Sequence, residues 1–172
     1  MRTIPRAALV LLWSAALLCA SPAAGAQSPW SESWQVKGTG RYYASPALAD
    51  LNGDGRVEII AAAAGAEHRL NVHRCDGGPF WSFFAAGELT SSPAVGDLDG
   101  DGCLEVLQAD REGYLYCLRA DGGLRWVRPV TGGVEWGSVG LVARGDGSRL
   151  AVVGSQSKGV YAFAPSGDLL WR

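Results

Sequence analysis

Tryptophan recurs along the chain at nearly constant intervals. Trp34, Trp81, Trp126 and Trp171 are separated by 47, 45 and 45 residues, and the last three each follow a Ser-Gly or Asp-Gly turn. A fixed period of 20–50 residues indicates that one supersecondary unit is repeated and stacked. The sequence therefore predicts three units of about 45 residues, preceded by a partial one.

Two acidic loops follow the same period. The segment from Asp50 to Glu58 reads D-x-N-x-D-G-x-x-E, and the segment from Asp97 to Glu105 repeats it 47 residues later with Asp99 at the third position. Oxygen-bearing side chains at alternating positions, bent by a glycine, make a cage suited to a hard cation, and Ca²⁺ accepts flexible loops of this kind better than Mg²⁺ does. The two loops therefore predict two Ca²⁺ sites.

Each unit reads as four short strands. In the second unit we expect strands at 93–98, 103–109, 114–119 and 124–127, because apolar and polar residues alternate there and Gly-containing turns separate them. Four antiparallel strands per repeat are typical of a β-propeller blade. The expected fold is all-β, with about three four-stranded antiparallel propeller blades. Three are fewer than a closed ring needs, which leaves a partial or open propeller, a truncated chain and self-association as alternatives.

The acidic loops resemble a known repeat family. Residues 50–60 (D-L-N-G-D-G-R-V-E-I-I) and 97–107 are similar to the calcium loops of FG-GAP or VCBS repeats, which occur in the propeller of integrin α chains. Residues 113–126 and 159–171 are also similar to PQQ-type propeller repeats. The resemblance implies that side chains at loop positions 1, 3, 5 and 9 and the carbonyl at position 7 bind Ca²⁺. The implied ligands are Asp50, Asn52, Asp54, Arg56 (carbonyl) and Glu58 in the first loop, and Asp97, Asp99, Asp101, Cys103 (carbonyl) and Glu105 in the second.

Other interpretations of the loops fit less well. An EF-hand needs a glutamate at position 12 and flanking helices, but position 12 is Ala61 or Gln108 and both flanks read as strands. The second loop has one carboxylate more than the first, so its Ca²⁺ site is the better supported of the two predictions. In the third unit the corresponding positions are Val142, Arg144 and Asp146, and we expect no metal there.

The N-terminus reads as an export signal. Arg2 and Arg6 precede an apolar stretch, and Ala24-Gly25-Ala26 resembles a cleavage site. Cys19 leaves lipidation as an alternative. Loss of residues 1–26 would change the formal charge from −2 to −4, with no basic run, which argues against a nucleic-acid partner. The expected location is secreted or periplasmic, with no transmembrane segment.

The remaining cysteines and histidines form no catalytic or zinc pattern. An exported compartment permits a disulfide among Cys75, Cys103 and Cys117, but the pairing stays open. His68 and His73 are interpreted as packed or surface residues, and catalytic motifs such as G-x-S-x-G are missing. Trp30 and Trp136 fall outside the tryptophan period, and we interpret them as packing residues, with an exposed aromatic that binds a carbohydrate or a protein as the alternative.

The sequence thus predicts a secreted, calcium-stabilised propeller that binds or scaffolds a protein or a carbohydrate and is not an enzyme. The alternatives are a fragment of a propeller enzyme (a quinoprotein dehydrogenase or a polysaccharide lyase) and an outer-membrane assembly or adhesion module. The expected boundaries are a signal peptide at 1–26, an N-terminal segment with an outer-type strand at 27–43, two blades with calcium loops at 44–88 and 89–133, and a blade with a degenerate loop at 134–172.

Overall fold

The computed structural model describes residues 34–38, 40–156 and 159–172. They belong to a compact unit at Ser33–Arg172, separate from Met1–Glu32. The predicted signal peptide, Cys19 and Trp30 lie outside the described residues. Among the residues described, no helix is long and apolar enough to cross a membrane.

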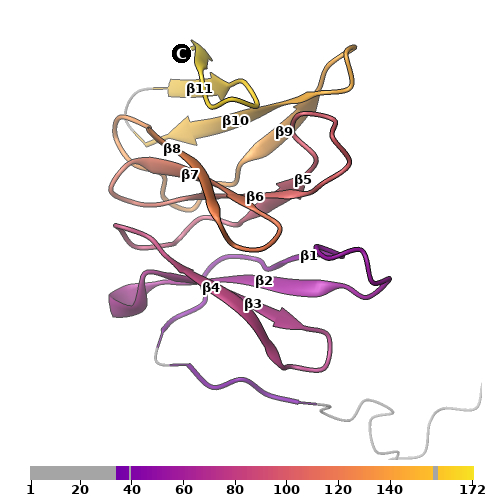
Figure 1. Cartoon of the computed structure of the whole chain (residues 1–172). Coiled ribbons are helices and arrows are strands. Elements are labelled where there is room, and N and C mark those ends of the chain that lie inside the picture. The colour runs from indigo at the N-terminus through magenta and orange to yellow at the C-terminus, as the bar shows by residue number, and fades with distance from the viewer. Residues whose placement is uncertain (1–33, 39, 157–158) are drawn as a thin grey trace, which may run out of the picture. The chain divides into compact units, whose positions relative to one another are not determined.

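The described residues form three four-stranded antiparallel sheets, which Figure 1 shows in chain order. The prediction of an all-β chain with about three four-stranded blades is confirmed. Within each sheet the strands pair in sequence order, each with the next, which is the meander of a propeller blade. The first sheet contains β1 (Ala47–Ala49), β2 (Glu58–Ala63), β3 (Arg69–Arg74) and β4 (Pro79–Phe84), with a short 3₁₀ helix, η1 (Gly65–Glu67), between β2 and β3. The second contains β5 (Ala94–Gly96), β6 (Glu105–Ala109), β7 (Tyr114–Arg119) and β8 (Leu124–Pro129). The third contains β9 (Gly140–Ala143), β10 (Arg149–Ser155), β11 (Gly159–Phe163) and β12 (Leu169–Trp171).

Each blade buries its faces against its neighbours. One apolar cluster joins the first blade to the second, with Ile60 and Leu70 from one and Val106 and Leu118 from the other. A second cluster joins the second blade to the third and contains Leu107 and Phe163. Because residues alternate between the two faces of a strand, the central strands of the second blade, β6 and β7, contribute to the first cluster with their even positions and to the second with their odd positions.

The periodic tryptophans lock each blade to the next one. The indole of Trp126, in β8, lies over Gly167 in the turn between β11 and β12, and its Nε1 donates to the Pro165 carbonyl at 2.9 Å. Trp81 makes the same contact with Gly122 and donates to the Ala120 carbonyl at 2.8 Å. The turn glycines have a positive φ, and a Cβ at either position would lie 2.9 Å or less from the ring, so only glycine fits beneath the indole. We call this contact the tryptophan clasp.

The two ends of the stack differ. Trp34 forms a clasp on Gly77 and donates to the Cys75 carbonyl at 2.9 Å, although residues 34–38 form no strand, so the expected outer-type strand is absent from them. At the other end, Trp171 is 50% exposed whereas Trp126 is 6% exposed.

A substitution beneath one clasp tests this packing. Gly122 (φ +86°) lies under Trp81, whereas Gly147 (φ +87°) has open space where a Cβ would be. We expect Gly147→Ala to lower the free energy of unfolding by about 1–2 kcal/mol, the cost of a left-handed alanine. Gly122→Ala should cost about 1–3 kcal/mol more, because it also overpacks the indole. Urea unfolding followed by tryptophan fluorescence measures both values, and equal losses would contradict the clasp.

Candidate metal centres

Both acidic loops connect the first strand of a blade to the second. In the first loop the Asp50 carboxylate accepts hydrogen bonds from the amides of Gly53 (2.8 Å) and Gly55 (2.7 Å). In the second, Asp97 accepts from Gly100 (2.7 Å) and Gly102 (3.0 Å). The opening aspartate therefore folds each loop around itself, as an Asx turn does.

The closing glutamates are buried and tie the two ends of each loop together. Glu58 begins β2 and is 1% exposed, and Glu105 begins β6 and is 3% exposed. The Oε2 atom of Glu58 accepts the Leu51 amide at 2.8 Å, and Glu105 accepts the Leu98 amide at the same distance. The two loops thus have the same backbone hydrogen bonds to aspartate and glutamate, although their sequences differ.

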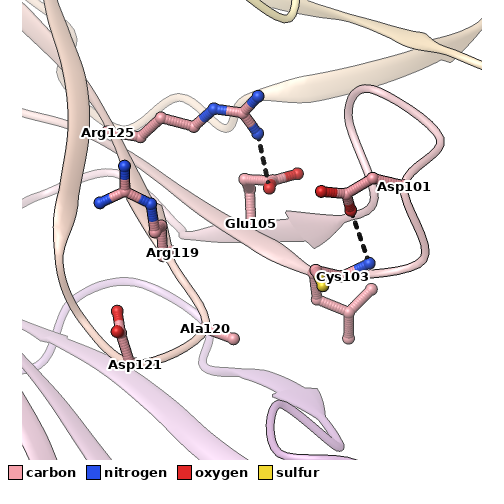
Figure 2. Close-up of a pocket in the computed structure, with 8 residues that line it drawn as sticks. Asp101, Cys103, Glu105, Arg119, Ala120, Asp121 and Arg125 are labelled. Carbon is pink, nitrogen blue, oxygen red and sulfur yellow. Dashed lines mark hydrogen bonds and ion pairs between the residues drawn. The ribbon is translucent and has the colours of Figure 1, made fainter.

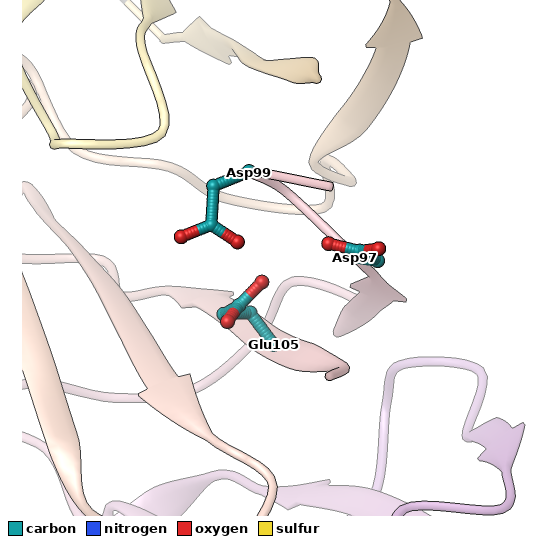
Figure 3. A group of neighbouring side chains, drawn as sticks. All are labelled: Asp97, Asp99 and Glu105. Carbon is teal, nitrogen blue, oxygen red and sulfur yellow. The ribbon is translucent and has the colours of Figure 1, made fainter. Parts of the chain in front are cut away.

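Three of the residues predicted for the second loop come together. Figure 3 shows the carboxylates of Asp97, Asp99 and Glu105, which each offer an oxygen within 4.8 Å of the others. Converging carboxylates of this kind fit a Ca²⁺ ion. Asp101 stands apart from this group, because its Oδ1 accepts the Cys103 amide at 2.7 Å.

The first loop fits a cation for a different reason. Among the described residues, Glu58 forms no ion pair and has the Leu51 amide as its hydrogen-bond partner. A carboxylate that is almost fully buried normally has a cationic partner or binds a metal. Its acidic neighbours do not converge on it as those of the second loop do. The Asp54 carboxylate instead accepts the side-chain amide of Asn52 at 3.1 Å and the backbone amide of Arg56 at 2.8 Å.

Sequence reasoning missed two arginines beside the second loop. Arg125, in β8, forms ion pairs with Asp99 and, at 2.7 Å, with Glu105. The Arg125 guanidinium lowers the pKa of Asp99, while burial raises the pKa of Glu105. Arg149, in β10 of the next blade, donates through its side chain to the Asp97 carbonyl and through its amide to the Leu98 carbonyl at 2.7 Å. An alignment of the repeats would have singled out both arginines: 45 residues earlier, around the first loop, Phe80 stands in place of Arg125 and Leu104 in place of Arg149.

A pocket of about 390 Å³ opens beside the second loop (Figure 2). Glu105, Arg119, Asp121 and Arg125 are among its lining residues, so its wall carries both signs of charge. Cys103 also lines it, and the Asp101 charge raises the pKa of that thiol.

The third loop has a different construction. It is one residue shorter, since seven residues separate the paired Val142 and Leu150 where eight separate Gly96 and Glu105. Arg144 and Ser148 close it through a backbone hydrogen bond of 2.8 Å, and the Asp146 carboxylate accepts the Ser148 amide at 3.0 Å. An apolar residue, Leu150, replaces the buried glutamate, so this loop has no buried charge to neutralise.

The remaining predicted residues lie apart from the loops or are packed. Cys75 and Cys103 are exposed free thiols, and Cys117 is a buried one whose pKa burial raises to about 12. His73 lies in β3 with its Nδ1 buried and without a hydrogen-bond partner. The interpretation of Trp136 as a packing residue is wrong: it is 65% exposed, because its backbone is left-handed (φ 56°) and the connection from β8 to β9 turns the side chain outward.

Comparisons with known proteins agree with the fold and with the repeat. A family model described as an FG-GAP-like repeat matches residues 50–108. Among solved structures, the chain is similar to the biofilm matrix protein Bap1 of V. cholerae (23% identity, TM-score 0.57), covering 74% of this chain and 19% of that one. It is also similar to BamB from Moraxella catarrhalis (19% identity, TM-score 0.54; 76% and 34% covered) and to BBS1N in complex with ARL6DN (16% identity, TM-score 0.57; 80% and 42% covered).

The chain spans less than half the length of each of these structures, and no curated protein matched it. At these identities the structural similarity describes the fold alone. The sequence resemblance of the loops is confirmed by the family model, which spans both of them. Residues 50–108 therefore match the FG-GAP-like repeat, and they lie on blades of the β-propeller type.

Proposed function

We propose that the protein is an exported, calcium-stabilised propeller module that binds a protein or a carbohydrate and catalyses no reaction. The observation that carries the calcium part is the buried Glu58, which has no cationic partner among the described residues, in a loop that also contains Asp50 and Asp54. The predicted signal peptide at 1–26 supports export, to the outside of the cell or to the periplasm.

The residues that would hold Ca²⁺ come from the loops. Asp50, Asn52, Asp54 and Glu58, with the Arg56 carbonyl, would bind one ion. Asp97, Asp99, Asp101 and Glu105, with the Cys103 carbonyl, would bind the second. The ion would supply positive charge to carboxylates that otherwise repel one another, and would hold the start of a strand to the loop before it.

An exposed aromatic pair supports the binding role. Trp136 packs edge-to-face on Tyr43 with ring centroids 5.4 Å apart, and the Tyr43 hydroxyl accepts a hydrogen bond from Arg41 at 3.1 Å. Tyr43 precedes the first blade and Trp136 precedes the third, so the pair joins segments 93 residues apart. Tryptophan, tyrosine and arginine are the residues enriched at binding hot spots. A left-handed, non-glycine backbone at such an exposed side chain is also a costly conformation of the kind found at functional sites.

The similar structure of a biofilm matrix protein is compatible with a role outside the cell. Partner binding is favoured over catalysis because the converging acids of the second loop are engaged by Arg125 and by backbone amides. Groups engaged in this way position a loop and are poorly placed to transfer protons to a substrate.

Removal of calcium tests the first part of the proposal. At about 2 mM Ca²⁺ and a dissociation constant of about 0.1 mM, each occupied site adds about 1.8 kcal/mol to the free energy of unfolding. We expect EDTA to lower the melting temperature by roughly 5 °C for each site lost. The same concentration of Mg²⁺ should restore less of it, because Mg²⁺ demands stricter geometry. Equal melting temperatures with and without EDTA would show that the loops bind no calcium.

Substitution of the aromatic pair tests the binding role. We expect Trp136→Ala to weaken binding of the protein to immobilised extracellular-matrix polysaccharide or matrix protein by about 2 kcal/mol, or about 30-fold. Phe84→Ala is the matched control, because Phe84 is 69% exposed but ends an outer strand, β4. Surface plasmon resonance measures both variants. An equal loss of affinity in the two variants would show that the binding surface does not include Trp136.

A further inference from the structure

The two FG-GAP loops are folded alike but differ in their surrounding charge. Each has an Asp that accepts loop amides and a buried Glu that accepts a leucine amide at 2.8 Å. In the second loop, however, Arg125 already pairs with two of the three converging carboxylates. The Arg125 side chain is 25% exposed and the Glu105 side chain 4%, so the ion pair between them is largely shielded from water.

The strand register identifies the counterpart of Arg125 in the first blade. Trp126 pairs with Cys117, as Trp81 pairs with Val72, and the residue before each tryptophan is Arg125 or Phe80. The Phe80 ring lies beneath the Arg74 guanidinium, with the two 5.1 Å apart, and brings no charge to Glu58. The second loop also has Arg149 on its Asp97 carbonyl, where the first blade's neighbour has Leu104.

We propose that Arg125 is the resident cation of the second loop and competes with Ca²⁺ for Asp99 and Glu105. This inference rests on the proposed calcium function. Ca²⁺ must break two ion pairs to enter the second loop, one of them shielded from water, whereas in the first loop it meets a buried carboxylate that forms no ion pair. The first loop therefore fills at the lower calcium concentration, although it has one carboxylate fewer.

The geometry also provides a place for the displaced guanidinium. Arg125 lines the 390 Å³ pocket beside the loop, and the Asp121 carboxylate lies on the same wall (Figure 2). The side chain can withdraw into this solvent-filled space without moving β8. In the second loop, Ca²⁺ thus replaces the Arg125 guanidinium, and the guanidinium holds the loop in shape when calcium is absent.

A reciprocal exchange of the two residues tests the proposal in the full chain. Asp50→Asn silences the first loop and Asp97→Asn silences the second, so each site is titrated with CaCl₂ alone by isothermal titration calorimetry. In the Asp50→Asn chain, Arg125→Phe should tighten calcium binding about tenfold. In the Asp97→Asn chain, Phe80→Arg should weaken it about tenfold. Arg125→Gln repeats the first comparison with a polar side chain, in case the phenylalanine disturbs folding.

Thermal unfolding gives a second readout. In EDTA, Arg125→Gln should lower the melting temperature because the ion pairs are lost, and in excess Ca²⁺ the difference from the parent chain should shrink or reverse. If the second loop binds calcium with the same affinity whether or not Arg125 is present, this inference is wrong and the calcium function stands. If neither loop binds calcium in any of the chains, the proposed function itself is wrong.

Discussion

The contact between an indole and a glycine turn is the interaction on which the rest of the structure depends. A four-stranded sheet has two apolar faces and cannot bury either of them alone. The tryptophan clasp solves this at the outer edge: the ring of Trp126 covers a turn of the next blade, and its Nε1 satisfies a carbonyl there. Because the turn must be glycine and the ring must be large and carry a donor, the same residues recur at each junction.

The clasp turn joins the third and fourth strands of a blade, and the acidic loop with its buried glutamate joins the first and second strands at the same end of the blade. Glu58 and Glu105 begin the second strand of their blades, where a charged side chain is nearly removed from water. Each accepts a backbone amide of the preceding loop, so the residue is part of the core and of the loop at once. Fold and candidate site are therefore coupled: weakening the loop also exposes a charge at the start of a central strand.

The fold could be predicted from the sequence because both signals are local and repeated. In each repeat, one tryptophan covers a glycine turn and one aspartate accepts the amides of its own loop, so both residues recur at fixed positions. Arg125 and Arg149 were missed because they lie 20 residues or more from the carboxylates and carbonyls that they contact, and a single arginine carries no signal of its partner. Aligning the units position by position would have shown that Arg125 of the second unit corresponds to Phe80 of the first. Trp136 is exposed and has a left-handed backbone, and its residue type indicates neither.

The loops between the first and second strands of the three blades differ in how the charge of a buried glutamate is balanced. The third loop has no such charge, since Leu150 replaces the glutamate and a shorter backbone turn closes the loop. The second keeps the glutamate and neutralises it with Arg125, a cation built into the chain. The first keeps the glutamate, and no described side chain forms an ion pair with it. A buried charge of that kind is costly unless something outside the chain supplies the countercharge. Dependence on calcium should therefore be concentrated in the first blade.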